Sequence, residues 1–94
     1  MAHLFIRHKV KDYATWKDAF DGFIETRRIS GEKSWQIFHP DEDPNNLLIL
    51  FEWDNLDNAH AFMQNNELKK TMDEAGVLEQ PEAYFLEEYD QGTL

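Results

Sequence analysis

The chain has 94 residues, with 19 Asp and Glu against 9 Lys and Arg, a formal net charge of −10 and no cysteine. This charge repels a phosphate backbone and an anionic membrane surface, which argues against nucleic acid and membrane as partners. The lack of cysteine excludes disulfides, thiolate metal sites and cysteine nucleophiles. The length fits a single domain over residues 1–94, and no stretch approaches the roughly 18 apolar residues of a membrane span. We therefore expect a cytoplasmic domain.

The N-terminal third of the chain predicts a strand followed by an amphipathic helix. Residues 2–10 are rich in β-forming side chains, and Asp12 is suited to cap the helix that begins at Tyr13. One side of this helix carries side chains at three- and four-residue spacing: Tyr13, Trp16, Phe20, Phe23, Ile24 and Arg27. A single helix is expected to end near Gly31, while Gly22 inside it is expected to allow a close approach to the sheet.

The rest of the chain predicts three further strands and two more helices. Strands are expected over 34–39 and 47–53, joined by the turn segment 40–46. A helix is expected to begin at Leu56, to be interrupted at Asn65, and to be followed by a short helix that Gly76 closes. A last strand is expected over 83–89, followed by a frayed tail over 90–94.

The order of these elements, βαββαβ, predicts an α+β fold of the ferredoxin-like type. Its sheet is expected to have four antiparallel strands in the order 4-1-3-2, with the helices on one face. Residues 47–51 of the third strand are all apolar, so the strand carries apolar side chains on both of its faces. Both faces therefore require cover from water. A second copy of the chain is the simplest cover for the helix-free face, and we therefore expect a homodimer in which two sheets pack face to face.

Three segments carry a family resemblance: 10–16, 43–46 with the following strand that ends at 51–54, and 67–69 leading to 75–77. With the element order, they resemble the dimeric α+β barrel superfamily, which includes antibiotic-biosynthesis monooxygenase-like and cyclase-like small proteins. The resemblance implies two ferredoxin-like protomers that close a barrel around a ligand cavity. Members range from cofactor-free oxygenases to haem-degrading enzymes, dehalogenases and proteins without known activity, so the fold does not imply one reaction. None of the family's catalytic motifs maps onto this chain residue by residue.

Strand parity selects the residues expected to line the interior of the dimer. The third strand is expected to turn residues 47, 49, 51 and 53 to the helices, which leaves Glu52 on the other face. The proposed ligand-binding residues are Phe5, Arg7, Gln36, Phe38 and Glu52, an apolar enclosure with a few polar groups. The alternative for Arg7 and Glu52 is an ion-pair or hydrogen-bond network at the dimer interface.

The catalytic candidates are His8, Arg7 and Glu52. His8 shares the helix-facing parity of its strand and is expected to lie near Trp16, either as a packing residue or as a general base. His8 and Glu52 are expected at opposite ends of the sheet, too far apart for an acid–base pair within one protomer.

The sequence indicates neither a metal site nor a bound cofactor. Its four glycines lack the spacing of a phosphate-binding loop, which argues against nucleotide cofactors. Acidic residues from Asp41 to Glu52 match part of a calcium-loop template, but Asn46 stands where the template requires glycine. Haem handling is a third possibility that the superfamily leaves open, and no histidine is specified as its ligand.

Two functions of different class remain from these observations. The first is binding of a small apolar or aromatic metabolite in the barrel interior, with a cofactor-independent monooxygenase or cyclase reaction. The second is a non-catalytic dimerisation or ligand-sensing module whose interior is filled by side chains. A cavity of about 300 Å³ or more would separate them, and the sequence leaves open whether the chain is an enzyme.

Overall fold

The computed structural model describes residues 2–94, so Met1 of the predicted domain lies outside the described residues. Eight elements follow one another along the chain. They are β1 (Ala2–Lys9), α1 (Tyr13–Gly22), α2 (Ile24–Ser30), β2 (Glu32–Phe38), β3 (Asn46–Trp53), α3 (Leu56–Met63), α4 (Asn66–Glu74) and β4 (Glu82–Glu87). None of the helices within residues 2–94 has the length and apolar character needed to cross a membrane.

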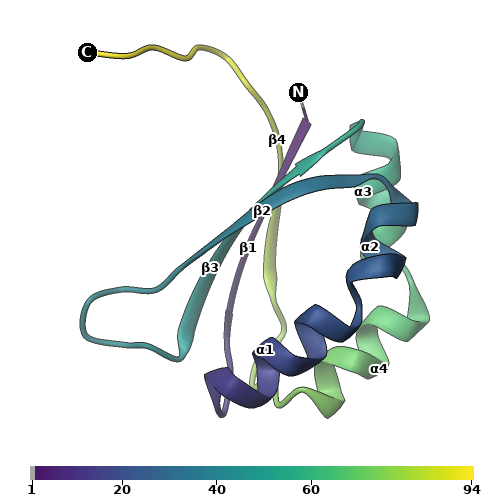
Figure 1. The fold of residues 1–94 in the computed structure, drawn as a ribbon, viewed down its shortest axis with the longest axis vertical. Coiled ribbons are helices and arrows are strands. Elements are labelled where there is room, and N and C mark those ends of the chain that lie inside the picture. Colours follow the sequence, from purple (N-terminus) through teal and green to yellow (C-terminus); the bar gives the residue numbers. More distant parts are fainter. Residues whose placement is uncertain (1) are drawn as a thin grey trace.

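The four strands form one antiparallel sheet in the order β2-β3-β1-β4. All four helices lie against one face of this sheet, and the other face is bare (Figure 1). The predicted strand order, 4-1-3-2, and the ferredoxin-like α+β fold are therefore confirmed.

The core lies between the sheet and the helices and follows the predicted alternation. In β3, residues Leu47, Ile49, Phe51 and Trp53 are each no more than 4% exposed, while the residues between them are half-buried. In β1, Leu4 and Ile6 are buried on the same side. One face of the sheet thus supplies the floor of the core, and the side chains of alternate parity form the helix-free face.

The prediction of a single helix between the first two strands is wrong, because the chain bends at Phe23 and forms two helices, α1 and α2. The Phe23 N–H lies 3.2 Å from the carbonyl of Ala19 and 3.3 Å from that of Phe20, a bifurcated arrangement typical of a helix end. The prediction for Gly22 is wrong as well, since nothing lies within 4 Å of the position its Cβ would take. Gly22 is the last residue of α1, where its low helix propensity favours the bend.

The ends of two strands also differ from the prediction, for reasons of pairing. Strand β4 ends at Glu87 because its partner on β1 is Ala2, the first residue of that strand. Strand β2 begins two residues early, at Glu32, and contains a bulge: Glu32 pairs with Trp53, whereas Ser34 pairs with Glu52. The bulge turns the Glu32 side chain toward the helices and leaves Ser34 on the helix-free face.

Candidate functional site

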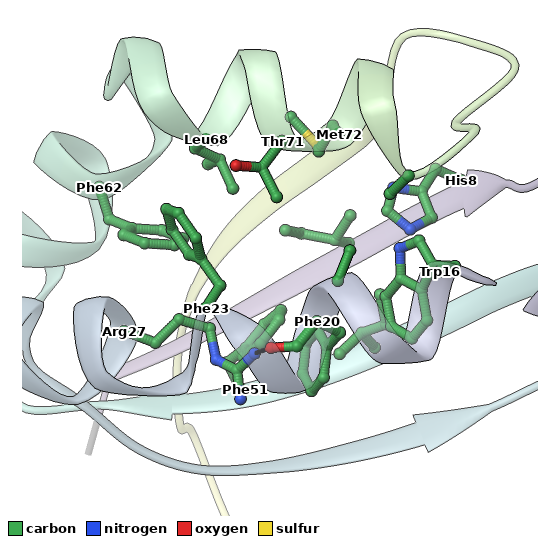
Figure 2. A pocket seen from close by; sticks show the side chains of 14 residues that line it. His8, Trp16, Phe20, Phe23, Arg27, Phe51, Phe62, Leu68, Thr71 and Met72 are labelled. Carbon is green, nitrogen blue, oxygen red and sulfur yellow. Dashed lines mark hydrogen bonds between the residues drawn. The ribbon is translucent and has the colours of Figure 1, made fainter. Parts of the chain in front are cut away.

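A cavity of about 60 Å³ lies between the sheet and the helices. Strands β1 and β3 form its floor, and α1, α2, α3 and α4 contribute its walls and roof (Figure 2). Its lining is apolar and rich in aromatic rings except at three residues, His8, Arg27 and Thr71. An apolar enclosure with a few convergent polar groups is the usual character of a small-molecule site.

His8 reaches this cavity because alternate residues of β1 face the helices. Its side chain is buried, and its ring meets that of Trp16 edge-on at 5.7 Å between centroids, which confirms the predicted neighbourhood. Neither ring nitrogen has a hydrogen-bond partner among residues 2–94. Burial lowers the pKa of His8 to about 4, so at neutral pH the imidazole is uncharged and offers one donor and one acceptor.

Arg27 and Glu32 form a buried ion pair next to the same cavity. The Arg27 Nε lies 3.0 Å from Glu32 Oε1, and Arg27 Nη1 donates to the backbone carbonyl of Phe20. The guanidinium lies 3.6 Å from the centroid of the Phe20 ring and 5.1 Å from that of Trp35. Burial raises the pKa of Glu32 to about 7, against the opposing attraction of the Arg27 charge.

We did not predict this ion pair from the sequence, although one signal for it was present. Arg27 occupies a position of the apolar stripe of the first helical region, where a charged side chain points into the core and requires a partner. Glu32 carried no such signal, because only the bulge in β2 gives it the helix-facing parity.

The five predicted ligand-binding residues all lie on the helix-free face, as the strand parity implied. The Phe5 ring lies 6.3 Å from that of Tyr84, and Arg7 Nη1 forms an ion pair with Glu82 Oε1 at 3.0 Å. Glu52 accepts a hydrogen bond of 3.2 Å from Ser34 Oγ. Gln36 and Phe38 are exposed. Because only a covering chain would enclose these residues, their ligand-binding role stays a prediction.

The sheet separates the three catalytic candidates. His8 lies on the helix-facing side, whereas Arg7 and Glu52 lie on the helix-free face. Arg7 is opposite Leu48, and Glu52 is opposite His3, so Arg7 and Glu52 also lie at different levels of the sheet. One ligand therefore cannot contact His8 together with the other two within a protomer.

No protein-family model and no curated protein matches the sequence. Solved structures do match. SnoaB, a cofactor-independent oxygenase from Streptomyces nogalater, has a TM-score of 0.76 and 11% identity over 96% of this chain and 94% of its own. An antibiotic biosynthesis monooxygenase has a TM-score of 0.70 and 12% identity, with 96% and 100% covered. A conserved protein from Methanosarcina mazei Go1 has a TM-score of 0.72 and 14% identity, with 94% and 92% covered.

These likenesses establish the fold over nearly the whole chain. The chain has the fold of the antibiotic biosynthesis monooxygenase-like proteins, as the sequence resemblance indicated. At these identities the comparison concerns the backbone arrangement, and the chemistry has to be argued from the side chains of this chain.

Proposed function

We propose that this chain is a cofactor-independent monooxygenase that acts on a small hydroxylated aromatic molecule in the cavity between the sheet and the helices. The observation that carries the proposal is His8, a buried, uncharged imidazole with two unpartnered nitrogens on the wall of an apolar, aromatic cavity. The likeness to SnoaB, described as a cofactor-independent oxygenase, supports the reaction class.

His8 would serve as the proton carrier of this reaction. Its unprotonated nitrogen accepts the hydroxyl proton of the substrate, and the resulting aryl oxide is electron-rich enough to reduce dioxygen. One oxygen atom enters the ring as a carbonyl, the other leaves as water, and both hydrogens lost by the substrate end in that water. The low pKa of His8 makes it a weak base but a ready acid, so it returns the proton to the reduced oxygen. The apolar walls keep bulk water out.

Met72 provides a way into the cavity, which is too small for a metabolite in its present form. It also lines a surface groove of about 600 Å³ between α4 and residues 77–83. Met72 is unbranched and flexible, and none of the residues of α4 is fully buried. A rotation of Met72 with an outward shift of α4 would join the two spaces and reach the volume of about 300 Å³ or more that a small-molecule site requires.

Oxidation of 1-naphthol by dioxygen tests the proposed reaction. We expect oxygen uptake with formation of naphthoquinone, measured with an oxygen electrode and by absorbance, and one labelled atom in the quinone when ¹⁸O₂ is used. His8→Phe should lower the turnover about 100-fold or more, the usual effect of losing a general base. His39→Phe is the matched control, because His39 is exposed. Equal turnover by the two variants would contradict the role of His8.

A non-catalytic dimerisation or ligand-sensing module is the second candidate, and one observation favours it. The cavity of about 60 Å³ is well below the volume of an ordinary ligand site. Binding of 1-naphthol without oxygen uptake by the unmodified protein would select this candidate over the monooxygenase.

We also propose that the chain forms a homodimer through its helix-free face. The middle of this face carries Phe5, Leu48 and Leu50, which are half-buried, and Tyr84 and Leu86 on β4 are 51% and 40% exposed. The rim is polar, with the Arg7–Glu82 ion pair at one side. Two copies of such a face can pack against each other, because their apolar centres come into contact while the charged residues at the rim keep their ion pairs.

Leu50→Asp is expected to weaken the dimer at least 100-fold, because it places an unpaired charge at the centre of the proposed interface. The dissociation constant is measured by sedimentation equilibrium. Ile29→Asp serves as the control, since Ile29 on α2 is 78% exposed and lies on the helical side. A monomeric unmodified protein, or a Leu50→Asp variant that dimerises normally, would contradict the proposal.

A further inference from the structure

Arg27 has one nitrogen, Nη2, that has neither an ion-pair partner nor a hydrogen-bond partner among residues 2–94. The side chain is 2% exposed, and it lines the cavity from the α2 side. Its Nη1 donates a hydrogen bond to the Phe20 carbonyl. Its Nε is ion-paired with Glu32 at 3.0 Å, and both Nε and Nη2 are buried without a hydrogen-bond partner among residues 2–94. Buried donors in native proteins are almost always paired, so an unpaired guanidinium N–H on a side chain that lines a cavity requires an acceptor.

The charges around the cavity restrict that acceptor to an uncharged oxygen. Above pH 7, where Glu32 is ionised, its carboxylate at 3.0 Å balances the positive charge of Arg27, and the buried imidazole of His8 is uncharged. The cavity lining contains no further Lys, Arg, Asp or Glu in the part of the chain that the structure describes. A carboxylate or phosphate placed here would be a buried anion without a free counter-charge, whereas a carbonyl oxygen accepts the hydrogen bond without that cost.

The two polar groups lie at opposite ends of the cavity. Figure 2 shows His8 beside Trp16 at one end and Arg27 toward the other. A row of aromatic rings connects them, because Trp16 stacks on Phe20 at 4.8 Å and the Arg27 guanidinium lies over Phe20. Phe51 pairs with Leu4, which is four residues from His8 on β1, a rise of about 13 Å. A flat aromatic molecule with an oxygen at each end covers a length of this order when a hydrogen bond of about 2.9 Å is added at each oxygen.

We propose that Arg27 is a specificity-determining residue that donates from Nη2 to an uncharged carbonyl oxygen of the ligand, at the end opposite the hydroxyl group held by His8. The proposal rests on the proposed function, which places the ligand in this cavity. It adds that the ligand carries an uncharged carbonyl group at the end away from His8. Glu32 takes part by balancing the guanidinium charge, so the pair as a whole selects carbonyl compounds over anions.

Three phenols with the same ring test this selection by isothermal titration calorimetry at pH 7.5. They are 4-hydroxyacetophenone, with an uncharged carbonyl, 4-hydroxybenzoate, with a carboxylate, and 4-ethylphenol, with no oxygen at that position. We expect 4-hydroxyacetophenone to bind about 10- to 100-fold more tightly than either of the others, the range for a hydrogen bond to a charged donor. Equal binding of the acetyl and ethyl compounds, or tightest binding of the carboxylate, would overturn the proposal.

A double variant assigns the preference to Arg27. Arg27→Met with Glu32→Leu removes both charges together, so neither is left buried alone, and it is expected to bind the acetyl and ethyl compounds equally. Removal of a surface ion pair of the same residue types, Arg28→Met with Glu25→Leu, is the matched control and should keep the preference. A preference that survives in the Arg27 double variant would overturn the proposal. If none of the three phenols binds the unmodified protein, both the Arg27 proposal and the proposed ligand-binding function are contradicted. Equal binding of all three contradicts the Arg27 proposal alone.

Discussion

Replacing Arg27 by Met is expected to lower the free energy of unfolding by about 3–5 kcal/mol, because the change leaves the Glu32 carboxyl buried without its partner. The variant also loses the donor to the Phe20 carbonyl and the stacking of the guanidinium on the Phe20 and Trp35 rings. For a domain of this length, the melting temperature should fall by at least about 12 °C. Urea denaturation at pH 8, where Glu32 is ionised in the unmodified protein, measures the loss directly by tryptophan fluorescence.

The double variant Arg27→Met and Glu32→Leu distinguishes lost pairing from lost packing. Buried ion pairs replaced on both sides by apolar residues are often as stable as the original, so we expect the double variant to recover most of the stability. A single variant within about 1 kcal/mol of the unmodified protein would contradict the buried pair, since an exposed pair has an effect of about that size. An equal loss in both variants would assign the effect to packing instead.

The strand order could be predicted from the order of the elements along the chain, and the two faces of the sheet because they depend on a period of two. Along residues 47–53, buried side chains alternate with half-buried ones. Because β1 pairs with β3 in a regular antiparallel register, the side chains of β1 point to the same two faces in the same alternation. His8 could be placed beside Trp16 on the same grounds. The five predicted ligand-binding residues also lie on one face, because the strand pairing is regular where they lie, along β1 and β3 and from Ser34 to Phe38 of β2.

The ion pair and the cavity could not be predicted because they depend on departures from regular structure. The bulge at Lys33 reverses the parity of Glu32, and the bend at Phe23 sets the direction of α2 and hence the position of Arg27. Neither irregularity has a strong signature in one sequence, since Gly22 is compatible with a helix interior as well as a helix end. The periodicity of the sequence therefore predicted the helices and strands that surround the cavity. The Arg27–Glu32 pair on its wall could be found only from the three-dimensional structure.

Glu32 and His8 are expected to act on stability in opposite directions as the pH changes. Burial raises the pKa of Glu32 from its ordinary 4.5 to about 7, so the native state keeps a proton that the unfolded chain has released. Its contribution is fully present below pH 4.5 and is lost as the pH rises toward 7. Burial lowers the pKa of His8 from 6.5 to about 4, so its contribution is fully present above pH 6.5 and is lost as the pH falls through 4. Each effect reaches about 3 kcal/mol.

The two effects nearly cancel between pH 4.5 and 6.5, and single variants should reveal them. The stability of the unmodified protein relative to Glu32→Gln is expected to fall by about 2–3 kcal/mol as the pH rises through this range, and its stability relative to His8→Phe is expected to rise by a similar amount. Urea denaturation at pH 4.5, 5.5 and 6.5 gives both differences, and the many exposed carboxylates drop out because every variant carries them. Differences that stay constant with pH would contradict the buried positions of these two groups. They would also remove the uncharged imidazole on which the proposed oxygenase chemistry depends.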